Sequence, residues 1–184
     1  KQLGLNKWSY SRFPLSWAVN NGLTKVVEAL LAEKEPVNQV DTVGRTALHE
    51  CATLVREGKS VILLEESVKI AELLFTAGAD PNKGSVSLRT PLHELFCRGQ
   101  DEASASFTRL PGGKASYYVT EGSTDPILKA KFKRVMVRTM LQWGADALAQ
   151  DRHGLGPVHY CAKEDAGGCM VEMLRAGVDG AALT

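Results

Sequence analysis

Apolar side chains recur along this chain in a paired pattern that is typical of buried helices. In four segments they fall at positions i, i+1, i+4 and i+5, which places all of them on one face of an α-helix. The pattern therefore predicts four similar helices. The four sets are Val26-Val27 with Leu30-Leu31, Ile70-Ala71 with Leu74-Phe75, Met136-Val137 with Met140-Leu141, and Cys169-Met170 with Met173-Leu174.

A short phrase precedes each of these segments. It reads RTALHECA at 45–52, RTPLHELF at 89–96 and, in weaker form, FPLSWAV at 13–19 and GPVHYCA at 156–162. The Leu or Val of each phrase serves as an anchor, and the intervals are 33, 44 and 66 residues between Leu15, Leu48, Leu92 and Val158. From the end of each helix pattern to the next anchor the distance is constant at 17 residues. We therefore interpret the chain as four repeats, two of which carry extra residues between a first and a second helix.

The extra residues are predicted to lengthen the second helix of the second and third repeats. Ser60 can cap one long helix, and Asp125 with Pro126 can begin the other, of about 18 residues or roughly 27 Å. Gly, Ser and Thr dominate residues 99–124, so we expect a loop there. The expected repeats span about 8–40, 41–84, 85–150 and 151–184, and the insertions about 55–65 and 99–131.

A Thr-Pro-Leu-His phrase with a period of about 33 residues resembles the ankyrin repeat. The resemblance covers nearly the whole chain from about residue 8, and it implies an all-α solenoid in which each repeat is a β-hairpin or turn followed by two antiparallel helices. It also implies that His49, His93 and His159 hydrogen-bond neighbouring backbone and tie adjacent hairpins together. The first repeat departs from the pattern, since it has Ser16 in place of this histidine and Lys34 in place of the glycine that ends the second helix.

Charge and cysteine content narrow the possible partners and compartments. The chain of 184 residues has 22 basic and 21 acidic side chains, a net charge of +1, so nothing indicates binding to nucleic acid or an anionic membrane. The longest apolar run, at 61–64, is too short for the roughly 20 residues of a membrane span. Four irregularly spaced cysteines favour free thiols and an intracellular protein of the cytoplasm or nucleus. A first residue other than Met leads us to expect a piece of a longer protein.

No catalytic or cofactor motif is present in the sequence. A Gly-x-Ser-x-Gly phrase, a phosphate-binding glycine loop and a His-Glu-x-x-His phrase are all missing. The histidine column could in principle hold a metal together with Cys51 and Cys161, but we favour the structural role implied by the resemblance. We therefore expect no enzyme activity, no cofactor and no bound metal.

The resemblance implies that hairpin tips and exposed sides of first helices line a concave groove that binds a partner protein. Because Arg12, Arg45 and Arg89 hold equivalent positions and arginine pairs well with carboxylates, we expect a preference for an acidic or extended polar peptide. The candidate groove residues are Ser9, Tyr10, Arg12, Asn20, Asn21, Thr42, Val43, Arg45, Thr53, Leu54, Val86, Ser87, Arg89, Cys97, Arg98, Arg152, His153, Leu155, Lys163 and Glu164.

Two further hypotheses concern the insertion and the turns. The 99–131 insertion is a second candidate docking surface, through Phe107, Leu110, Tyr117 and Tyr118. Asn38 and Asn82 each follow a leucine by eight residues, a pattern similar to that of ankyrin domains hydroxylated on asparagine. The predicted function is a non-catalytic protein-interaction module, an adaptor, scaffold or targeting domain. The alternative is a regulatory domain of a larger enzyme or channel that binds a segment of its own chain.

Overall fold

The computed structural model describes residues 14–97 and 125–176. Within these ranges every regular element is a helix, and no strand is present. The helices are α1 (Pro14–Asn20), α2 (Thr24–Ala32), α3 (Ala47–Glu57), α4 (Val61–Thr76), α5 (Pro91–Glu94), α7 (Pro126–Gln142), α8 (Pro157–Lys163) and α9 (Gly167–Arg175).

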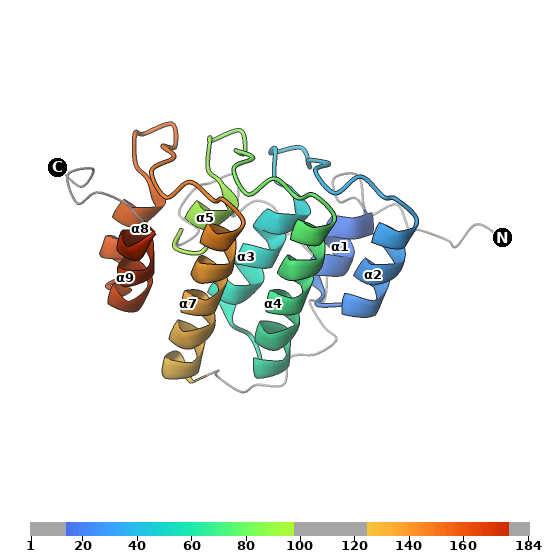
Figure 1. Cartoon of the computed structure of the whole chain (residues 1–184), viewed down its shortest axis with the longest axis horizontal. Helices are drawn as coiled ribbons and strands as arrows, with labels where there is room; N and C mark the ends of the chain where they lie inside the picture. Colours follow the sequence, from blue (N-terminus) through green and yellow to red (C-terminus); the bar gives the residue numbers. More distant parts are fainter. Residues whose placement is uncertain (1–13, 98–124, 177–184) are drawn as a thin grey trace, which may run out of the picture.

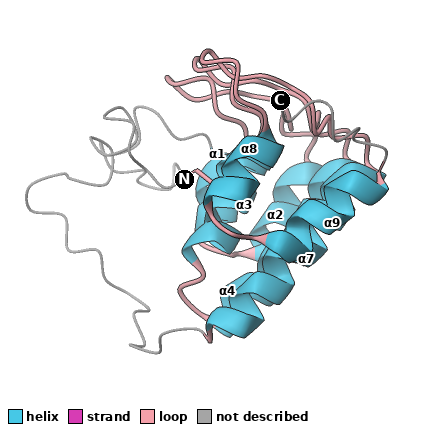
Figure 2. Ribbon diagram, turned by 90° about the vertical axis from the view of Figure 1, so that its left-hand side faces the viewer, coloured by secondary structure: helices cyan, strands magenta, loops and turns pink. Residues whose placement is uncertain are grey.

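The helices form two layers, with the connections between repeats gathered at one end. First helices α1, α3, α5 and α8 contact one another in sequence, as do second helices α2, α4, α7 and α9. Figure 2 shows the two layers side by side, and Figure 1 shows the turns between repeats along the top of the molecule. The all-α solenoid expected from the sequence is confirmed, with hairpin-like turns in place of strands.

The 11 extra residues of the second repeat are divided between two helices. Helix α4 has 16 residues against nine in α2 and α9, and α3 has 11 against seven in α1 and α8. Seven of them therefore lengthen α4 and four lengthen α3. The expectation that the second helix takes all of them was wrong. Both helices grow because antiparallel neighbours joined by a short turn must lengthen together.

The helix boundaries follow the capping residues expected from the sequence. The Ser60 hydroxyl accepts a hydrogen bond from the Leu63 N–H at 3.2 Å, and the Asp125 carboxylate accepts one from the Ile127 N–H at 2.9 Å. Gly78 follows α4 in the left-handed conformation, with φ of 89°. Lys34, which replaces this glycine in the first repeat, adopts the same conformation with φ of 62°. The backbone geometry of the repeat is thus kept even where the favoured residue is missing.

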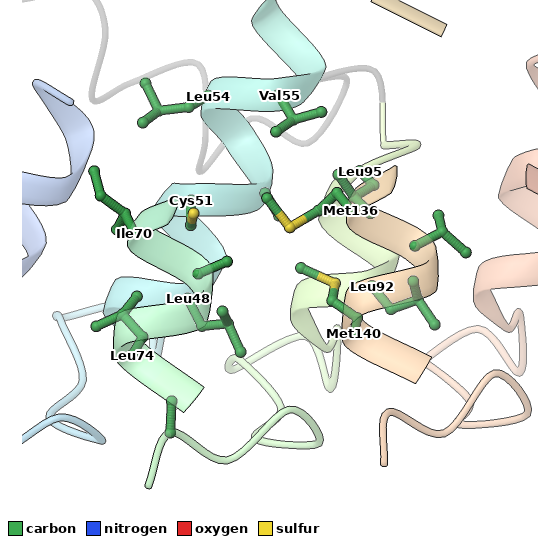
Figure 3. Close-up of a cluster of buried hydrophobic side chains, with 14 of the residues drawn as sticks. Leu48, Cys51, Leu54, Val55, Ile70, Leu74, Leu92, Leu95, Met136 and Met140 are labelled. Atoms are coloured by element: carbon green, nitrogen blue, oxygen red, sulfur yellow. The ribbon is translucent and has the colours of Figure 1, made fainter. Parts of the chain in front are cut away.

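The paired apolar pattern is buried in the middle repeats and partly exposed at the ends. Figure 3 shows Ile70 and Leu74 of α4 and Met136 and Met140 of α7 meeting leucines of the first-helix layer. In α2 and α9, by contrast, Val26 and Leu174 are exposed. Each of these two helices has a described neighbour in its layer on one side only, so the other side of its apolar stripe stays uncovered.

Candidate protein-binding surface

Three turns between repeats form a row of projections at one end of the first helices. We call them the second, third and fourth fingers, residues 41–45, 85–89 and 151–155. In each finger the N–H of the first residue donates to the carbonyl of the fifth, at 2.8 to 2.9 Å. The three fingers therefore share one closed turn, although no position has the same residue in all three.

Backbone hydrogen bonds also join each finger to the next. The Val86 N–H donates to the Val43 carbonyl at 2.9 Å, and the Arg152 N–H donates to the Ser87 carbonyl at 3.0 Å. Because main-chain groups make these bonds, the fingers are held in a continuous row without the use of side chains. The exposed side chains of this row are Thr42, Val86, Leu88, Arg152, His153 and Leu155. Such a rigid support lowers the entropy lost when a partner binds.

The histidine after each leucine anchors the next finger. The Nδ1 atoms of His49 and His93 accept hydrogen bonds from the backbone N–H of Thr46 and Thr90 at 3.0 and 3.1 Å. Their Nε2 atoms then carry the proton and donate to the carbonyls of Arg89 and Leu155 at 3.0 and 3.1 Å. For these two histidines the tie between hairpins expected from the resemblance is confirmed.

Burial lowers the pKa of both imidazoles. Desolvation disfavours the charged form of His49 and of His93, and it outweighs the hydrogen bonds that their ring nitrogens make to the Arg89 and Leu155 carbonyls. The neutral tautomer is the one that can accept at Nδ1 and donate at Nε2. The anchor between fingers therefore works best with an uncharged ring.

Arg45, on the second finger, is engaged inside its own repeat. Its guanidinium pairs with the Glu50 carboxylate and lies 3.5 Å from Asp41 Oδ2. Asp41 in turn accepts hydrogen bonds from the N–H groups of Val43 and Arg45 at 3.0 and 2.8 Å. The Arg45 charge is thus largely balanced by two carboxylates before any partner arrives.

Arg89, on the third finger, reaches into the fourth repeat. Its Nη2 donates to the Tyr160 hydroxyl at 3.2 Å, its Nε lies 3.6 Å from Asp151 Oδ2, and its guanidinium lies 5.5 Å from the centre of the Tyr160 ring. Burial and a 2.6 Å hydrogen bond donated to Asp151 raise the pKa of Tyr160 to about 12. Burial alone would raise the pKa of Asp151, but hydrogen bonds from Tyr160 and from backbone N–H groups, with the Arg89 charge, lower it overall.

Nine of the described candidate residues lie on the three fingers, and the others lie in or just after the first helices. Exposed candidates are Asn21, Thr42, Val86, Arg152, His153, Leu155 and Lys163. Partly buried candidates are Asn20, Val43, Arg45, Ser87, Arg89 and Glu164. Outside the described residues lie Ser9, Tyr10, Arg12, Arg98 and the insertion candidates Phe107, Leu110, Tyr117 and Tyr118.

Three candidates are buried, and their assignment to a binding surface was wrong. Thr53 and Leu54 are 6% and 2% exposed, and Cys97 is also buried. Helix α3, which carries the first two, contacts α1, α4, α5 and α7. A helix enclosed on so many sides has no free face in its second half.

Carboxylates at equivalent positions of two repeats were missed by the sequence reasoning. Glu50 and Glu94 follow the histidine in both phrases and are buried. Glu94 accepts a hydrogen bond from Arg56 at 3.0 Å, and the same Arg56 nitrogen donates to the Cys97 carbonyl at 2.9 Å. The repeated His-Glu pair was the signal available, because a residue type that recurs at one position of a repeat has a common environment.

Asn38 and Asn82 bridge successive repeats. Their side-chain amides donate to the carbonyls of Gly78 and Gly144 at 2.9 Å, and their side-chain oxygens accept from the N–H of Asp80 and Asp146 at 2.8 and 2.7 Å. Both asparagines are exposed. These bonds account for their presence, while hydroxylation of either residue stays a prediction.

Within the described ranges, no three His, Cys, Asp or Glu side chains are grouped so that they could hold a metal ion. Both ring nitrogens of His49 and His93 are already occupied by hydrogen bonds. The same part of the chain contains no helix with the length and hydropathy that crossing a membrane requires.

A solenoid of helical repeats with joined fingers defines a class of repeat proteins, and comparison with known proteins specifies the class. A model of the ankyrin repeat matches residues 43–85. The human ankyrin repeat and SOCS box protein 16 is 28% identical over 161 residues, which cover 82% of this chain and 33% of that protein. The crystal structure of an ankyrin repeat domain from Acinetobacter baumannii superposes with a TM-score of 0.62 at 17% identity, over 90% of this chain and 65% of that one.

The match to the family model, the human relative and the structural neighbour together support the ankyrin-repeat family for this chain. It spans about a third of the length of its human relative. Ankyrin repeats generally mediate protein–protein interaction, and domains built from them are typically non-catalytic.

Proposed function

We propose that this chain is a protein-recognition module that binds a partner protein or peptide through the finger surface, formed by the three fingers and the exposed residues of the first helices. The observation that carries the proposal is the row of fingers braced by main-chain hydrogen bonds and by His49 and His93. Such bracing presents outward side chains on a rigid support, which a recognition surface requires. The proposal places the protein in the cytoplasm or nucleus, as an adaptor, scaffold or targeting domain.

The preference for an acidic or extended polar peptide is part of this proposal, but its carriers differ from those first expected. Arg45 and Arg89 already face carboxylates of their own chain. Arg152 and Lys163 are exposed. These two side chains can bind partner carboxylates without first breaking an ion pair to a carboxylate of the described residues. We therefore assign the acidic preference to them.

The test is affinity purification of partners from cells with three forms of the chain. The first is unaltered, the second carries Thr42→Asp, Arg152→Glu and Lys163→Glu, and the third has residues 99–124 replaced by a short Gly-Ser linker. If the finger surface binds the partner, the second form loses it and the third retains it. The opposite result would assign binding to the insertion surface.

An intramolecular role is the second candidate, favoured by the finding that the chain spans a third of its human relative. In that case the finger surface would bind a segment of a longer parent protein, as in a regulatory domain of an enzyme or channel. Cross-linking of the intact parent protein, followed by mass spectrometry, would then join finger residues to that segment.

Hydroxylation of Asn38 and Asn82 is a separate part of the proposal. Intact-mass measurement on the protein before cross-linking would test it.

A further inference from the structure

The third finger contains a leucine where the other two have glycine. Gly44 and Gly154 adopt φ of 78° and 75° at the fourth position of their fingers, and Leu88 adopts φ of 60° at the same position. Its N–H makes the same turn bond as theirs, to the Ser85 carbonyl at 2.8 Å. A left-handed conformation is unfavourable for a residue with a Cβ atom, so a glycine would serve the turn better.

Burial of the Leu88 side chain does not compensate for this unfavourable conformation. The side chain is 58% exposed, and Val86, two residues earlier on the same finger, is 68% exposed. Exposure forfeits most of the stabilisation that removal of apolar surface from water would supply. The third finger thus combines an unfavourable backbone conformation with two exposed apolar side chains, and an outlier of this kind points to function.

The neighbouring fingers hold this arrangement in place. A Cβ atom on Gly44 would lie 2.8 Å from the Val86 nitrogen, so the second finger packs directly against the third. On the other side, the Arg152 guanidinium donates to the Ser87 hydroxyl at 3.1 Å, in addition to the backbone bond between the two residues. Val86 and Leu88 are therefore presented from a supported turn, with Leu155 exposed on the adjoining finger.

The charge beside these side chains is positive. The Arg152 guanidinium is bound to Ser87, the residue between Val86 and Leu88. The carboxylates of the fingers, Asp41 and Asp151, are turned inward, with side chains 12% and 0% exposed, and accept bonds from backbone N–H groups. A partner segment that lies along the third and fourth fingers thus meets exposed apolar side chains and an arginine, which complement an apolar group next to a carboxylate.

We infer that Val86, Leu88 and Leu155 form an apolar anchor site for an extended peptide that carries a large aliphatic or aromatic side chain next to a carboxylate, and that Arg152 binds this carboxylate. The inference rests on the proposed function and specifies its partner chemistry. The apolar side chain supplies most of the affinity because its burial at the centre of the contact excludes water. The arginine sets the position of the acidic residue along the peptide.

The probe is a phage-displayed library of random 12-residue peptides, selected on the whole chain. Enriched peptides are then synthesised, and their Kd values are measured by fluorescence anisotropy on four forms of the chain: unaltered, Leu88→Asn, Leu148→Asn and Arg152→Gln. Asparagine tolerates the left-handed conformation, so Leu88→Asn removes the apolar group while the turn is retained. Leu148→Asn is the matched control: Leu148 is 47% exposed, lies outside the fingers, and holds the repeat position of Asn38 and Asn82.

We expect enriched peptides to share an apolar residue next to Asp or Glu. Leu88→Asn should weaken their binding roughly tenfold or more, as loss of one buried leucine contact implies. Leu148→Asn should change the Kd by less than about twofold, since Leu148 lies outside the three fingers. Arg152→Gln should raise the Kd of peptides that contain the Asp or Glu. It should leave the Kd unchanged for peptides in which that residue is replaced by Gln.

Two results would overturn the inference in distinguishable ways. If enriched peptides bind the unaltered chain and Leu88→Asn leaves their Kd unchanged, the chain binds peptides but the anchor site does not exist. If the unaltered chain, shown to be folded by circular dichroism, enriches no peptide, the proposed peptide-binding function fails together with the anchor site. Unchanged melting of Leu88→Asn confirms that any loss of binding reflects the side chain.

Discussion

The second and third fingers each end at the arginine that begins an almost identical phrase, RTALHE or RTPLHE, yet they build the same turn from different residues. In the second finger, Asp41 accepts two backbone hydrogen bonds and Gly44 takes the left-handed position. In the third, Ser85 replaces the aspartate and Leu88 replaces the glycine. The second finger thus meets the needs of its turn with its own side chains, whereas the third finger does not.

The two arginines extend this contrast. Arg45 pairs with carboxylates of its own repeat, while Arg89 pairs with Asp151 and Tyr160 of the following one. The third finger therefore depends on its neighbours for hydrogen bonds to its backbone and for the carboxylate that balances the charge of its arginine. A repeat architecture permits this because each unit is stabilised by the next, so one unit can give up local stability for function.

The largest expected effect comes from what the two fingers share, the histidine anchor. His49→Ala removes one of the two hydrogen bonds that the Arg89 carbonyl accepts, and His93→Ala removes one of the two that the Leu155 carbonyl accepts. Each change also removes the side-chain acceptor of a buried backbone N–H. We expect each change to lower the free energy of unfolding by about 3 kcal/mol, measured by urea denaturation. His153→Ala, on an exposed side chain of the fourth finger, should cost less than about 0.5 kcal/mol. A cost near that of this control would show that the anchors do not join the fingers.

A second comparison sets Gly44 against Gly154. A Cβ atom at Gly44 would meet backbone atoms of the third finger at 2.8 to 3.2 Å, whereas a Cβ atom at Gly154 meets nothing within 4 Å. Gly154→Ala should therefore cost only the left-handed conformation, about 1 kcal/mol. Gly44→Ala should cost about 2 to 3 kcal/mol because the third finger must also shift. Equal costs in thermal denaturation would contradict the close packing of the second finger on the third.

The reverse substitution, Leu88→Gly, should stabilise the chain slightly. Release of the left-handed strain contributes about 1 to 2 kcal/mol, and the greater freedom of glycine in the unfolded chain offsets about half of it. We expect a net gain of about 0.5 kcal/mol and a small rise in Tm by calorimetry. A variant that is more stable and yet binds peptides less well would confirm that the third finger trades stability for recognition. A loss above about 1 kcal/mol would instead show that Leu88 supports the fold.

The smallest effect is a dependence of stability on pH that both anchors share. The pKa values of His49 and His93 are lowered by burial, so the unfolded chain, whose histidines titrate near about 6.5, binds more protons below that pH. Stability should be fully present above about pH 6.5 and decline as the pH falls below it. NMR titration of the two imidazoles should give pKa values below that of a free histidine, and the decline should be weaker in His93→Ala. Stability that rises on acidification to pH 5 would contradict the neutral anchor.

The repeat plan could be predicted in detail from the sequence, because it depends on local signals. Ser60 and Asp125 begin α4 and α7 as expected, since a cap satisfies backbone groups within a few residues of itself. The division of 11 extra residues between α3 and α4 was not predictable, because it depends on how two antiparallel helices match in length.

The binding surface was less predictable than the fold. The resemblance implies that Thr53 and Leu54 face a partner, but four neighbouring helices bury them. The arginine column was visible in the sequence, whereas the carboxylate that Arg89 faces, Asp151, comes from the following repeat. Leu88 could have been noticed, since it replaces a glycine of the other two fingers, but its exposure required the structure.

Residues close together along the chain set helix periodicity, caps and turns, so the amino-acid sequence was enough to predict which elements form and in what order. Contacts between distant segments set which of those residues remain available to a partner. Exposure and charge pairing depend on contacts between segments as far apart as Arg89 and Tyr160. The third finger illustrates both kinds of control. Its own sequence places Leu88 in an unfavourable left-handed conformation. Hydrogen bonds to the neighbouring fingers hold the turn in which Val86 and Leu88 are exposed.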